Sequence, residues 1–420
     1  EICACLVGSE MCIRDRLSCL LVAGCTSFDR NPYDGALREL RVTAVYPEGY
    51  AGYLREGVAV KLSDRNTGNV YTALTDAQGH AGFRVAAGHY RLSVLDLPDD
   101  SAVFNGTIEQ VDLVGGDKDV DVALKFSKPG TILIKEIYSG GCMQDPPATG
   151  TYADDKYIVL HNNSFETYYL DGLCLAMVAP YNSNANNPWT STDPSGNIVF
   201  RDYAAIPDCI WMFPGSGTDF PLEPGEDAVV AYYGVDHTQT YSQSVNLNRK
   251  GYFVLYDMVH YPGNKLHPTP VPGDQIDQAH YMKVLKKTGT NSAVVYVISQ
   301  NSPAMILFRA PEEFDMDAYL ADDLQSTVQN GSITYSKIPW DNDWIVDGVE
   351  VCNMTEATKN KRLHTDVDAG YIGFSAKAQG HTLHRKLDEE ATAAAGFERY
   401  VDTNNSSNDF YERETQSLRD

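Results

Sequence analysis

Two short segments near the start of the chain restrict what it can fold into, because every second residue in them is apolar. The segments are VAVKLSD (58–64) and HYRLSV (89–94), and the alternating apolar residues are Val58, Val60, Leu62, Tyr90, Leu92 and Val94. A period of two places these side chains on one face of a β-strand. Thr-Gly-Asn and Ala-Gln-Gly turns separate the segments. Short strands with such regular turns predict a β-sandwich.

The same region resembles a known module. TDAQGHAGFRVAAGHYRLSV (75–94) has the spacing of the carboxypeptidase-regulatory or transthyretin-like module, in which T-D-x-x-G precedes a strand and G-x-Y-x-L-x-V follows. The resemblance implies a seven-stranded sandwich over residues 39–127. Modules of this kind usually serve as spacers or accessory domains, so the resemblance implies no chemistry for this part of the chain.

The polar stretch KFSKPG (125–130) marks our predicted domain boundary, and residues 128–420 form the second predicted unit. This unit contains, in order, TILIKEIYSGGC, DKYIVLHNNSFETYYLDGLCLAMV, FPLEPGEDAVVAYYG, SVNLNRKGYFVLYD and WIVDGVEV. Together these segments resemble the lamin-tail domain, an immunoglobulin-like β-sandwich. Val159 stands where that family has an acid in its second strand, so no role of that acid transfers to this chain.

One insertion in the second unit, PEEFDMDAYLADDLQST (311–327), predicts a helix with Phe314, Ala318 and Leu320 facing inward. We expect this helix to cover the sandwich and the polar C-terminal tail to wrap the surface. The predicted fold class is therefore mainly β. It comprises a small transthyretin-like sandwich, followed by a larger, elaborated immunoglobulin-like (lamin-tail-like) sandwich with a short helical insertion.

The residues before the first strand indicate export. LSCLLVAG (17–24) is apolar but far shorter than the roughly 20 residues that span a bilayer. It suits the remnant of a signal peptide.

Its last residues and the next one, Val-Ala-Gly-Cys, resemble the lipobox of bacterial lipoproteins. The resemblance implies lipidation of Cys25 and a tether over residues 25–38. The protein would then lie at the outer membrane, and we expect it at the cell surface. A buried strand that happens to end in Cys is the alternative.

The residues before position 17 do not fit a lipoprotein precursor. MCIRDR (11–16) resembles the translation of a transposon-end adapter used in DNA sequencing. We therefore interpret residues 1–16 as a sequencing artefact and exclude them from the reasoning about the fold. A natural but unusual N-terminus is the alternative.

The net charge of the chain argues against polyanionic partners. Lys and Arg number 33 and Asp and Glu 57, so the formal charge is 33 − 57 = −24. This value argues against nucleic-acid binding and against adhesion to anionic lipid by charge alone. It suits a soluble body that a lipid holds at a membrane.

Four cysteines follow Cys25, namely Cys142, Cys174, Cys209 and Cys352. An even number in an exported protein permits disulfides. In the lamin-tail-like pattern, Cys142 ends the first strand and Cys174 lies in the third, so both can meet at one end of a sheet. We therefore expect a Cys142–Cys174 disulfide and free thiols at Cys209 and Cys352.

Compact catalytic motifs are absent from residues 26–420, which contain no Gly-x-Ser-x-Gly, phosphate loop, His-Glu-x-x-His or Cys-x-x-Cys. We therefore expect no enzyme. A glycan hydrolase with scattered acids is an alternative, because two carboxylates suffice for glycoside hydrolysis. A structural adhesin is a third possibility.

Asp and Asn are concentrated in DTNNSSNDF (402–410). Calcium takes about six to eight oxygen ligands, often from such residues in loops, which makes Asp402, Asn404 and Asp409 weak calcium candidates. We favour the alternative, an Asx-rich turn that caps its own backbone. We expect no other cofactor.

The strongest binding candidate is YNSNANNPWTSTDPSG (181–196). Its candidate ligand residues are Tyr181, Asn184, Asn186, Asn187 and Trp189. Loops of this composition bind sugars or proteins by ring stacking and adaptable hydrogen bonds. The alternative is an ordered loop with Trp189 packed into the sandwich.

The chain as a whole is similar to one family. The stretches IKEIYSGGC, DKYIVLHNNS, FPLEPGEDAV, SVNLN, WIVDGVEV, KNKRL and DTNNSSNDF resemble an uncharacterised family of Bacteroidota surface lipoproteins, a domain of unknown function. Its members tend to accompany TonB-dependent outer-membrane transporters. The resemblance therefore implies a lipid-anchored binding or accessory subunit of such an uptake system. It does not identify the ligand, for which a glycan and a protein both stay open.

Overall fold

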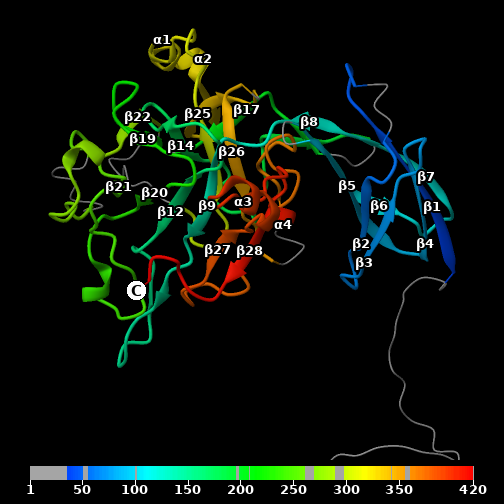
Figure 1. The fold of residues 1–420 in the computed structure, drawn as a ribbon, viewed down its shortest axis with the longest axis horizontal. Coiled ribbons are helices and arrows are strands. Elements are labelled where there is room, and N and C mark those ends of the chain that lie inside the picture. The colour runs from blue at the N-terminus through cyan, green and yellow to red at the C-terminus, as the bar shows by residue number, and fades with distance from the viewer. Residues whose placement is uncertain are drawn as a thin grey trace, which may run out of the picture.

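The computed structural model describes residues 36–50, 55–99, 102–194, 198–207, 209–260, 269–288, 298–341, 343–354 and 360–419. Strands dominate its regular structure, so the predicted mainly β fold class is confirmed. Figure 1 shows a smaller body at the right, built from the first strands, and a larger body at the left. Cys25 and the segments 1–16 and 17–24 lie outside the described residues, as does most of the expected tether 25–38.

The smaller body is a sandwich of two sheets. One has the strand order β4-β1-β7, with β1 (Leu37–Val45), β4 (His80–Ala86) and β7 (Lys118–Ala123). The other has the order β3-β2-β5-β6-β8, with β2 (Ala59–Asp64), β3 (Val70–Leu74), β5 (His89–Asp99), β6 (Ala102–Asp112) and β8 (Lys125–Ser127). Strand β1 runs antiparallel to β4 and parallel to β7.

A single hydrophobic core fills this sandwich, because the alternating apolar residues face inward. Val60, Leu62 and Leu92 are fully buried and belong to one cluster that also includes Leu40 and Leu124. The period of two in the sequence therefore identifies the inner face of β2 and β5 correctly.

The larger body is a second sandwich. Its six-stranded sheet has the order β21-β20-β12-β9-β27-β28, with β9 (Ile132–Tyr138), β12 (Tyr157–Asn162), β20 (Asp227–Ala231), β21 (Phe253–Val254), β27 (Thr382–Arg385) and β28 (Phe410–Arg413). Its five-stranded sheet has the order β22-β18-β14-β23-β26, with β14 (Cys174–Met177), β18 (Cys209–Met212), β22 (Lys283–Lys287), β23 (Ala304–Phe308) and β26 (Ile345–Glu350).

Several strands of the larger sandwich are buried along their whole length, namely β9, β12, β14 and β23. A strand that is covered on both faces needs no alternation, so its sequence is a nearly continuous apolar run. Trp211 and Phe213 are fully buried in the same core cluster as residues of both sheets.

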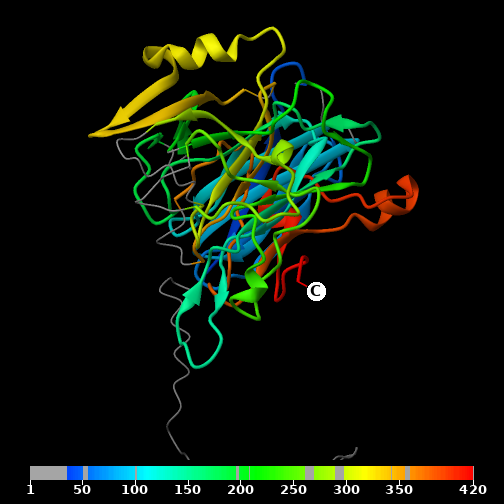
Figure 2. The same ribbon diagram turned by 90° about the vertical axis from the view of Figure 1, so that its left-hand side faces the viewer.

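An arm projects from the larger sandwich, at the top of Figures 1 and 2. Its elements are α1 (Met316–Ala321), α2 (Asp323–Ser326), β24 (Thr327–Asn330) and β25 (Ile333–Pro339), and β25 also pairs with β17 (Tyr203–Ile206). The single helix predicted over 311–327 is divided, because Asp322 ends α1 and its side chain caps α2. Leu320 is buried as predicted, but Phe314 is 37% exposed and Ala318 is also exposed, so the prediction for these two residues is wrong.

Short elements complete the described surface. They are β10 (Cys142–Met143), β11 (Thr151–Tyr152), β13 (Tyr168–Tyr169), β15 (Thr190–Thr192), β16 (Ile198–Phe200), β19 (Pro221–Leu222), η1 (His237–Gln239), η2 (Gln278–His280), α3 (Glu389–Ala395) and α4 (Ser406–Asp409). Within the described ranges, no helix has the length and apolar character that crossing a bilayer requires.

Candidate functional site

The Asn-rich loop, residues 181–188, connects β14 to β15 and is tied to the larger sandwich from beneath. The Ser183 N–H donates to Ser302 Oγ at 3.1 Å, and Ser183 Oγ accepts from the Asn353 N–H at 2.9 Å. The Asn187 side-chain amide donates to the Lys361 carbonyl oxygen at 2.8 Å. These contacts reach three separate segments, so they fix the backbone of the loop.

A buried arginine supports the same loop from the core. Arg362 Nη1 donates to the carbonyl oxygens of Pro180 at 3.3 Å and Ser302 at 2.5 Å. Its Nε donates to Glu350 Oε1 at 2.8 Å, and both charged side chains are fully buried. A buried ion pair is tolerated when its remaining polar atoms are also bonded. The remaining bonds of Arg362 hold Pro180, which precedes the loop, and Ser302, which binds the Ser183 N–H.

The outward side of the loop is open to solvent. Tyr181, Asn184 and Asn186 are exposed, and Asn187 is half-buried. The Tyr181 hydroxyl donates to the Ile298 carbonyl oxygen at 3.3 Å, which directs its ring. Three of the predicted ligand residues are therefore exposed in one loop, and we call these three residues the crest.

Trp189 does not belong to that crest. Its side chain is only 8% exposed, and its ring meets Tyr335 at 5.2 Å and Tyr203 at 6.1 Å between centroids, edge to face in both cases. The prediction of an exposed recognition ring is therefore wrong. Strands β17 and β25 cover the indole, because burying so large an apolar surface is strongly favourable.

Beside the loop lies a hollow of about 370 Å³, here called the amide hollow. Its lining residues are Asn301, Asn353, Met354, Phe374, Ser375, Ala376 and Lys377. Asn301 precedes the Ser302 that holds the loop, and the Asn353 backbone donates to Ser183, so the hollow adjoins the base of the loop. Sequence analysis missed these residues because they come from three distant segments that share no motif.

One wall of the amide hollow is fixed at both of its ends. The N–H and the hydroxyl of Ser375 both donate to Glu412 in β28 at 3.0 Å. The Ala378 N–H donates to the Gly140 carbonyl oxygen at 3.1 Å. Ala378 has a φ of 56°, a left-handed conformation that costs an L-residue about 1–2 kcal/mol. These hydrogen bonds therefore hold a turn that the alanine alone does not favour.

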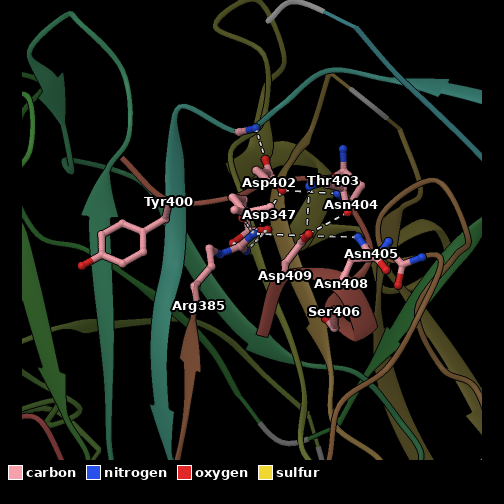
Figure 3. Close-up of polar contacts among 12 residues, drawn as sticks. Asp347, Arg385, Tyr400, Asp402, Thr403, Asn404, Asn405, Ser406, Asn408 and Asp409 are labelled. Carbon is pink, nitrogen blue, oxygen red and sulfur yellow. Dashed lines mark hydrogen bonds and ion pairs between the residues drawn. The ribbon is translucent and has the colours of Figure 1, made fainter. Parts of the chain in front are cut away.

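The calcium candidates Asp402 and Asp409 lie in a buried ionic cluster around Arg385 (Figure 3). Arg385 donates from Nη2 to Asp347 Oδ2 at 2.8 Å and from Nη1 to Asp402 Oδ1 at 3.1 Å. Its Nη1 also lies 3.5 Å from Asp409 Oδ2. We call these four residues the Arg385 cluster, and none of their side chains is more than 3% exposed.

The other carboxylate oxygens of the cluster are occupied by protein donors. Asp402 Oδ2 accepts from the Gly130 N–H at 2.5 Å. Asp409 accepts from the Thr403 hydroxyl at 2.6 Å and from the Thr403 N–H at 3.0 Å. A cation would have to displace Arg385 and these donors, so the arrangement is that of a structural ion cluster.

Asn404, the third calcium candidate, points elsewhere. Its side-chain amide donates to Ser127 Oγ at 2.9 Å. The bonds of Asp402 and Asn405 to the backbone N–H groups of Asn404 and Ser407 are those of the Asx-rich turn that we favour over calcium binding. In the part of the chain that the structure describes, no group of three or more His, Cys, Asp or Glu side chains is arranged to hold a metal ion.

Three carboxylates around one guanidinium leave excess negative charge in the Arg385 cluster. Burial raises the pKa of Asp347 and of Asp409 to about 7, because a charged carboxylate is poorly solvated there. The charge of Asp402 raises both values further, against the attraction of Arg385. Both carboxyls therefore favour the protonated form more strongly than a free aspartate does.

The same C-terminal segment, residues 402–409, joins the two sandwiches, and we call it the interdomain clasp. The Asn105 side-chain amide of β6 donates to the Thr403 carbonyl oxygen at 2.5 Å. The Asn404 amide donates to Ser127 in β8 at 2.9 Å. Both donor–acceptor pairs connect the clasp to the smaller sandwich, while Arg385 connects it to the larger one.

Cys142 and Cys174 do not form the predicted disulfide, since both are buried free thiols. Cys142 lies in the β10–β11 hairpin, whereas Cys174 pairs within the five-stranded sheet. Their thiols donate instead to Asp155 at 3.7 Å and to the Gly172 carbonyl oxygen at 3.6 Å. Burial raises the pKa of both thiols to about 12, which makes them unreactive at neutral pH.

Comparison with known proteins relates this fold to others. Residues 223–417 match the model of a family described as protein of unknown function (DUF4876). The crystal structure of a DUF4876 family protein from Bacteroides thetaiotaomicron VPI-5482 matches with a TM-score of 0.55 and 23% identity, over 89% of this chain and 94% of that chain. The chain is therefore similar to a domain of unknown function that also occurs in Bacteroides, and at this identity the structural match shows the fold alone.

A second solved structure is less similar. A DUF3823 family protein from Parabacteroides merdae ATCC 43184 matches with a TM-score of 0.19 and 15% identity, over 34% of this chain and 67% of that chain. A TM-score this low supports no structural argument. No curated protein matches the chain in sequence.

Proposed function

We propose that this chain is a lipid-anchored cell-envelope protein that binds an extracellular ligand through its Asn-rich loop. The observation that supports the proposal is that the loop exposes side-chain amides while its backbone is held in place. Asn184 and Asn186 are exposed, while Ser183 is buried and holds the backbone from beneath. Exposed amides on a fixed backbone lose little conformational entropy when they bind a ligand.

The smaller sandwich acts as a spacer in this proposal. The interdomain clasp supports that role, because Asn105 and Asn404 connect the two sandwiches through hydrogen bonds of 2.5 and 2.9 Å. A spacer that is bonded to the binding domain holds the Asn-rich loop at a set orientation to the membrane.

Cys25 supplies the anchor, on the strength of the lipobox-like Val-Ala-Gly-Cys and the polar stretch that follows it. In cells that express the chain behind a restored signal peptide, labelled palmitate should enter the protein, and Cys25→Ala should abolish the labelling. Protease treatment of intact cells should then degrade the anchored protein if it faces outward. Labelling that persists in Cys25→Ala would exclude this anchor, and protection from protease would exclude the cell surface.

The proposed partner is a TonB-dependent outer-membrane transporter, for which the chain would be a binding or accessory subunit. This part rests on the resemblance to Bacteroidota surface lipoproteins. Purification of the tagged protein from membranes of its native host, under mild detergent, should recover such a transporter in stoichiometric amount. Recovery of the anchored protein alone would contradict the partnership.

Ligand binding is tested by electrophoresis through native gels that contain purified polysaccharides. At least one polysaccharide should retard the full chain, and Tyr181→Ala/Asn184→Ala/Asn186→Ala should migrate freely with an unchanged melting temperature. Gln329→Ala, on the exposed end of the arm, is the matched control and should be retarded like the wild type. Retardation that survives the triple substitution would show that the Asn-rich loop is not the binding surface.

A further inference from the structure

We infer that the interdomain clasp is a pH-sensitive latch, which holds the smaller sandwich firmly in acid and more loosely in neutral and alkaline solution. This role goes beyond the proposed function, because it concerns how the two sandwiches are held together and not what the Asn-rich loop binds. Three features of the described residues support it: a polar junction, contacts that join this junction to the Arg385 cluster, and the excess of carboxylates in that cluster.

The junction between the sandwiches is polar. Each hydrophobic cluster of the described residues draws its members from one sandwich only. Hydrogen bonds and ion pairs cross the junction, among them Lys125 Nζ to Asp366 Oδ1 at 3.0 Å and Arg91 Nη2 to the Ala369 carbonyl oxygen at 3.1 Å. A hollow of about 310 Å³, lined by residues of both sandwiches, lies in the same junction. Two domains that share no apolar core can move relative to each other when such polar contacts break.

A short series of contacts joins this junction to the Arg385 cluster. The Thr403 carbonyl oxygen accepts from the Asn105 side-chain amide of the smaller sandwich at 2.5 Å. The N–H and the hydroxyl of Thr403 donate to Asp409, which lies beside Arg385 (Figure 3). The Gly130 N–H, in the connection between the sandwiches, donates to Asp402 at 2.5 Å. Asp402 and Asp409 therefore each hold a group that links the two sandwiches.

The Arg385 cluster carries excess negative charge when all of its carboxyls are ionised. Asp347, Asp402 and Asp409 surround one guanidinium, so the charge of the cluster is then 1 − 3 = −2. The other charged side chains that contact the clasp bind different atoms, because Lys61 and Lys386 donate to Asn408 and Asp368 accepts from Ser406. The excess charge of the cluster is therefore not balanced by an ion pair from these groups.

The direction of the pH effect follows from the two most buried carboxyls. Burial raises the pKa of Asp347 and of Asp409 from 3.8 to about 7. In an open clasp, water reaches these carboxyls and their pKa returns toward the ordinary value. Opening then releases a proton, so the equilibrium constant for opening should rise about tenfold per pH unit between about pH 4 and 7 and stay level above 7.

The test is hydrogen exchange of single backbone amides in the full chain, measured by mass spectrometry from pH 5 to 8 and corrected for the intrinsic exchange rate at each pH. The N–H groups of Thr403 and Gly130 report opening of the clasp, and that of Ile158 in the central strand β12 reports global unfolding. Both clasp amides should exchange faster than the Ile158 amide. Their protection should fall about tenfold per pH unit between pH 5 and 7.

Variants separate the charge of the cluster from the bond across the junction. Asp409→Asn should raise the protection of both clasp amides at pH 8, because asparagine is uncharged and the Thr403 hydroxyl can accept from its amide. Asp317→Asn, which removes an exposed carboxylate from α1, is the matched control and should leave the protection unchanged. Asn105→Ala should lower the protection of Thr403 at every pH, because it removes the bond to the smaller sandwich.

Each of three results would overturn the latch. Clasp amides that exchange as slowly as Ile158 would mean that the clasp opens only when the protein unfolds. Protection that is constant between pH 5 and 7, or that Asp409→Asn leaves unchanged, would mean that the cluster does not control opening. Unaltered protection of Thr403 in Asn105→Ala would mean that the clasp and the smaller sandwich are not coupled. No ligand and no lipid enters the experiment, so its outcome is independent of the proposed function.

Discussion

Two Asn-rich segments of this protein are alike in sequence and opposite in structure. In residues 181–188, Asn184 and Asn186 point to solvent, and the inward positions hold the loop in place. In residues 402–409, the carboxylates and amides turn inward, where Arg385 and the smaller sandwich occupy them.

The comparison teaches that composition does not decide whether a polar segment is available to a ligand. What decides is whether the protein already uses the polar atoms. The carboxylate oxygens of Asp409 already bind Thr403 and Arg385, whereas the side chains of Asn184 and Asn186 are exposed. The first segment therefore stabilises the fold, and the second supports the proposed binding function.

The largest expected effect is that of Arg385→Met. This substitution leaves three buried carboxylates without their cation, and breaking a buried ion pair in this way costs about 3–5 kcal/mol. The free energy of unfolding, measured with urea, should fall by that amount. Arg201→Met, which removes the same charge from an exposed position, is the control. Equal and small effects of both substitutions would mean that the clasp does not stabilise the fold.

Trp189→Ala should have the next largest effect. The indole is enclosed by Tyr203 and Tyr335, and truncating a buried tryptophan costs about 3–5 kcal/mol. Tyr181→Ala, in the same loop but exposed, should stay within about 0.5 kcal/mol of the wild type. The free energy of unfolding of both variants, measured by heat or urea, distinguishes a core residue from an exposed one. An unchanged stability of Trp189→Ala would mean that the indole is not part of the core.

The pH dependence of stability tests the charge balance of the clasp. Asp347 and Asp409 have their pKa raised from 3.8 to about 7 by burial. The folded state then holds protons that the unfolded state has released, so this stabilising contribution is full below about pH 4 and is lost as pH rises through 7. Relative to Asp409→Asn, the wild type should lose up to about 1.4 kcal/mol per pH unit over that interval. Stability curves that run parallel for the two proteins would contradict the shift.

The smallest expected effect is that of calcium. The carboxylates of Asp402 and Asp409 are already bonded to Arg385, Gly130 and Thr403. Millimolar calcium should therefore leave the urea midpoint where an equal concentration of magnesium leaves it. A rise in the urea midpoint that is specific to calcium and that Asp409→Asn abolishes would instead support a calcium site.

Local patterns allowed much of the fold to be predicted from sequence. Alternation at Val60 and Leu62 identified inner faces, because a half-buried strand has that period. The exposed positions Asn184 and Asn186 were also found, since polar loop residues usually face solvent.

Contacts between residues far apart in the sequence explain why the other features could not be predicted. Trp189 is buried by Tyr335, which comes from an arm far along the chain. Asn301, Asn353 and Phe374 meet in one hollow only after both sheets have formed. Cys142 and Cys174 were paired on a family resemblance, but their strands belong to different sheets.

The difference between the two Asn-rich segments is tested most directly by one matched pair of double substitutions. In Asn404→Ala/Asn405→Ala, the clasp loses the bond to Ser127 and the cap of α4, which Asn405 makes to the Ser407 N–H at 3.1 Å. These losses, together with the left-handed φ of 49° at Asn404, should cost about 2 kcal/mol or more. Asn184→Ala/Asn186→Ala should change the free energy of unfolding by less than about 0.5 kcal/mol. Equal costs in the two segments, or a larger cost in residues 181–188, would contradict the assignment of one to structure and the other to binding.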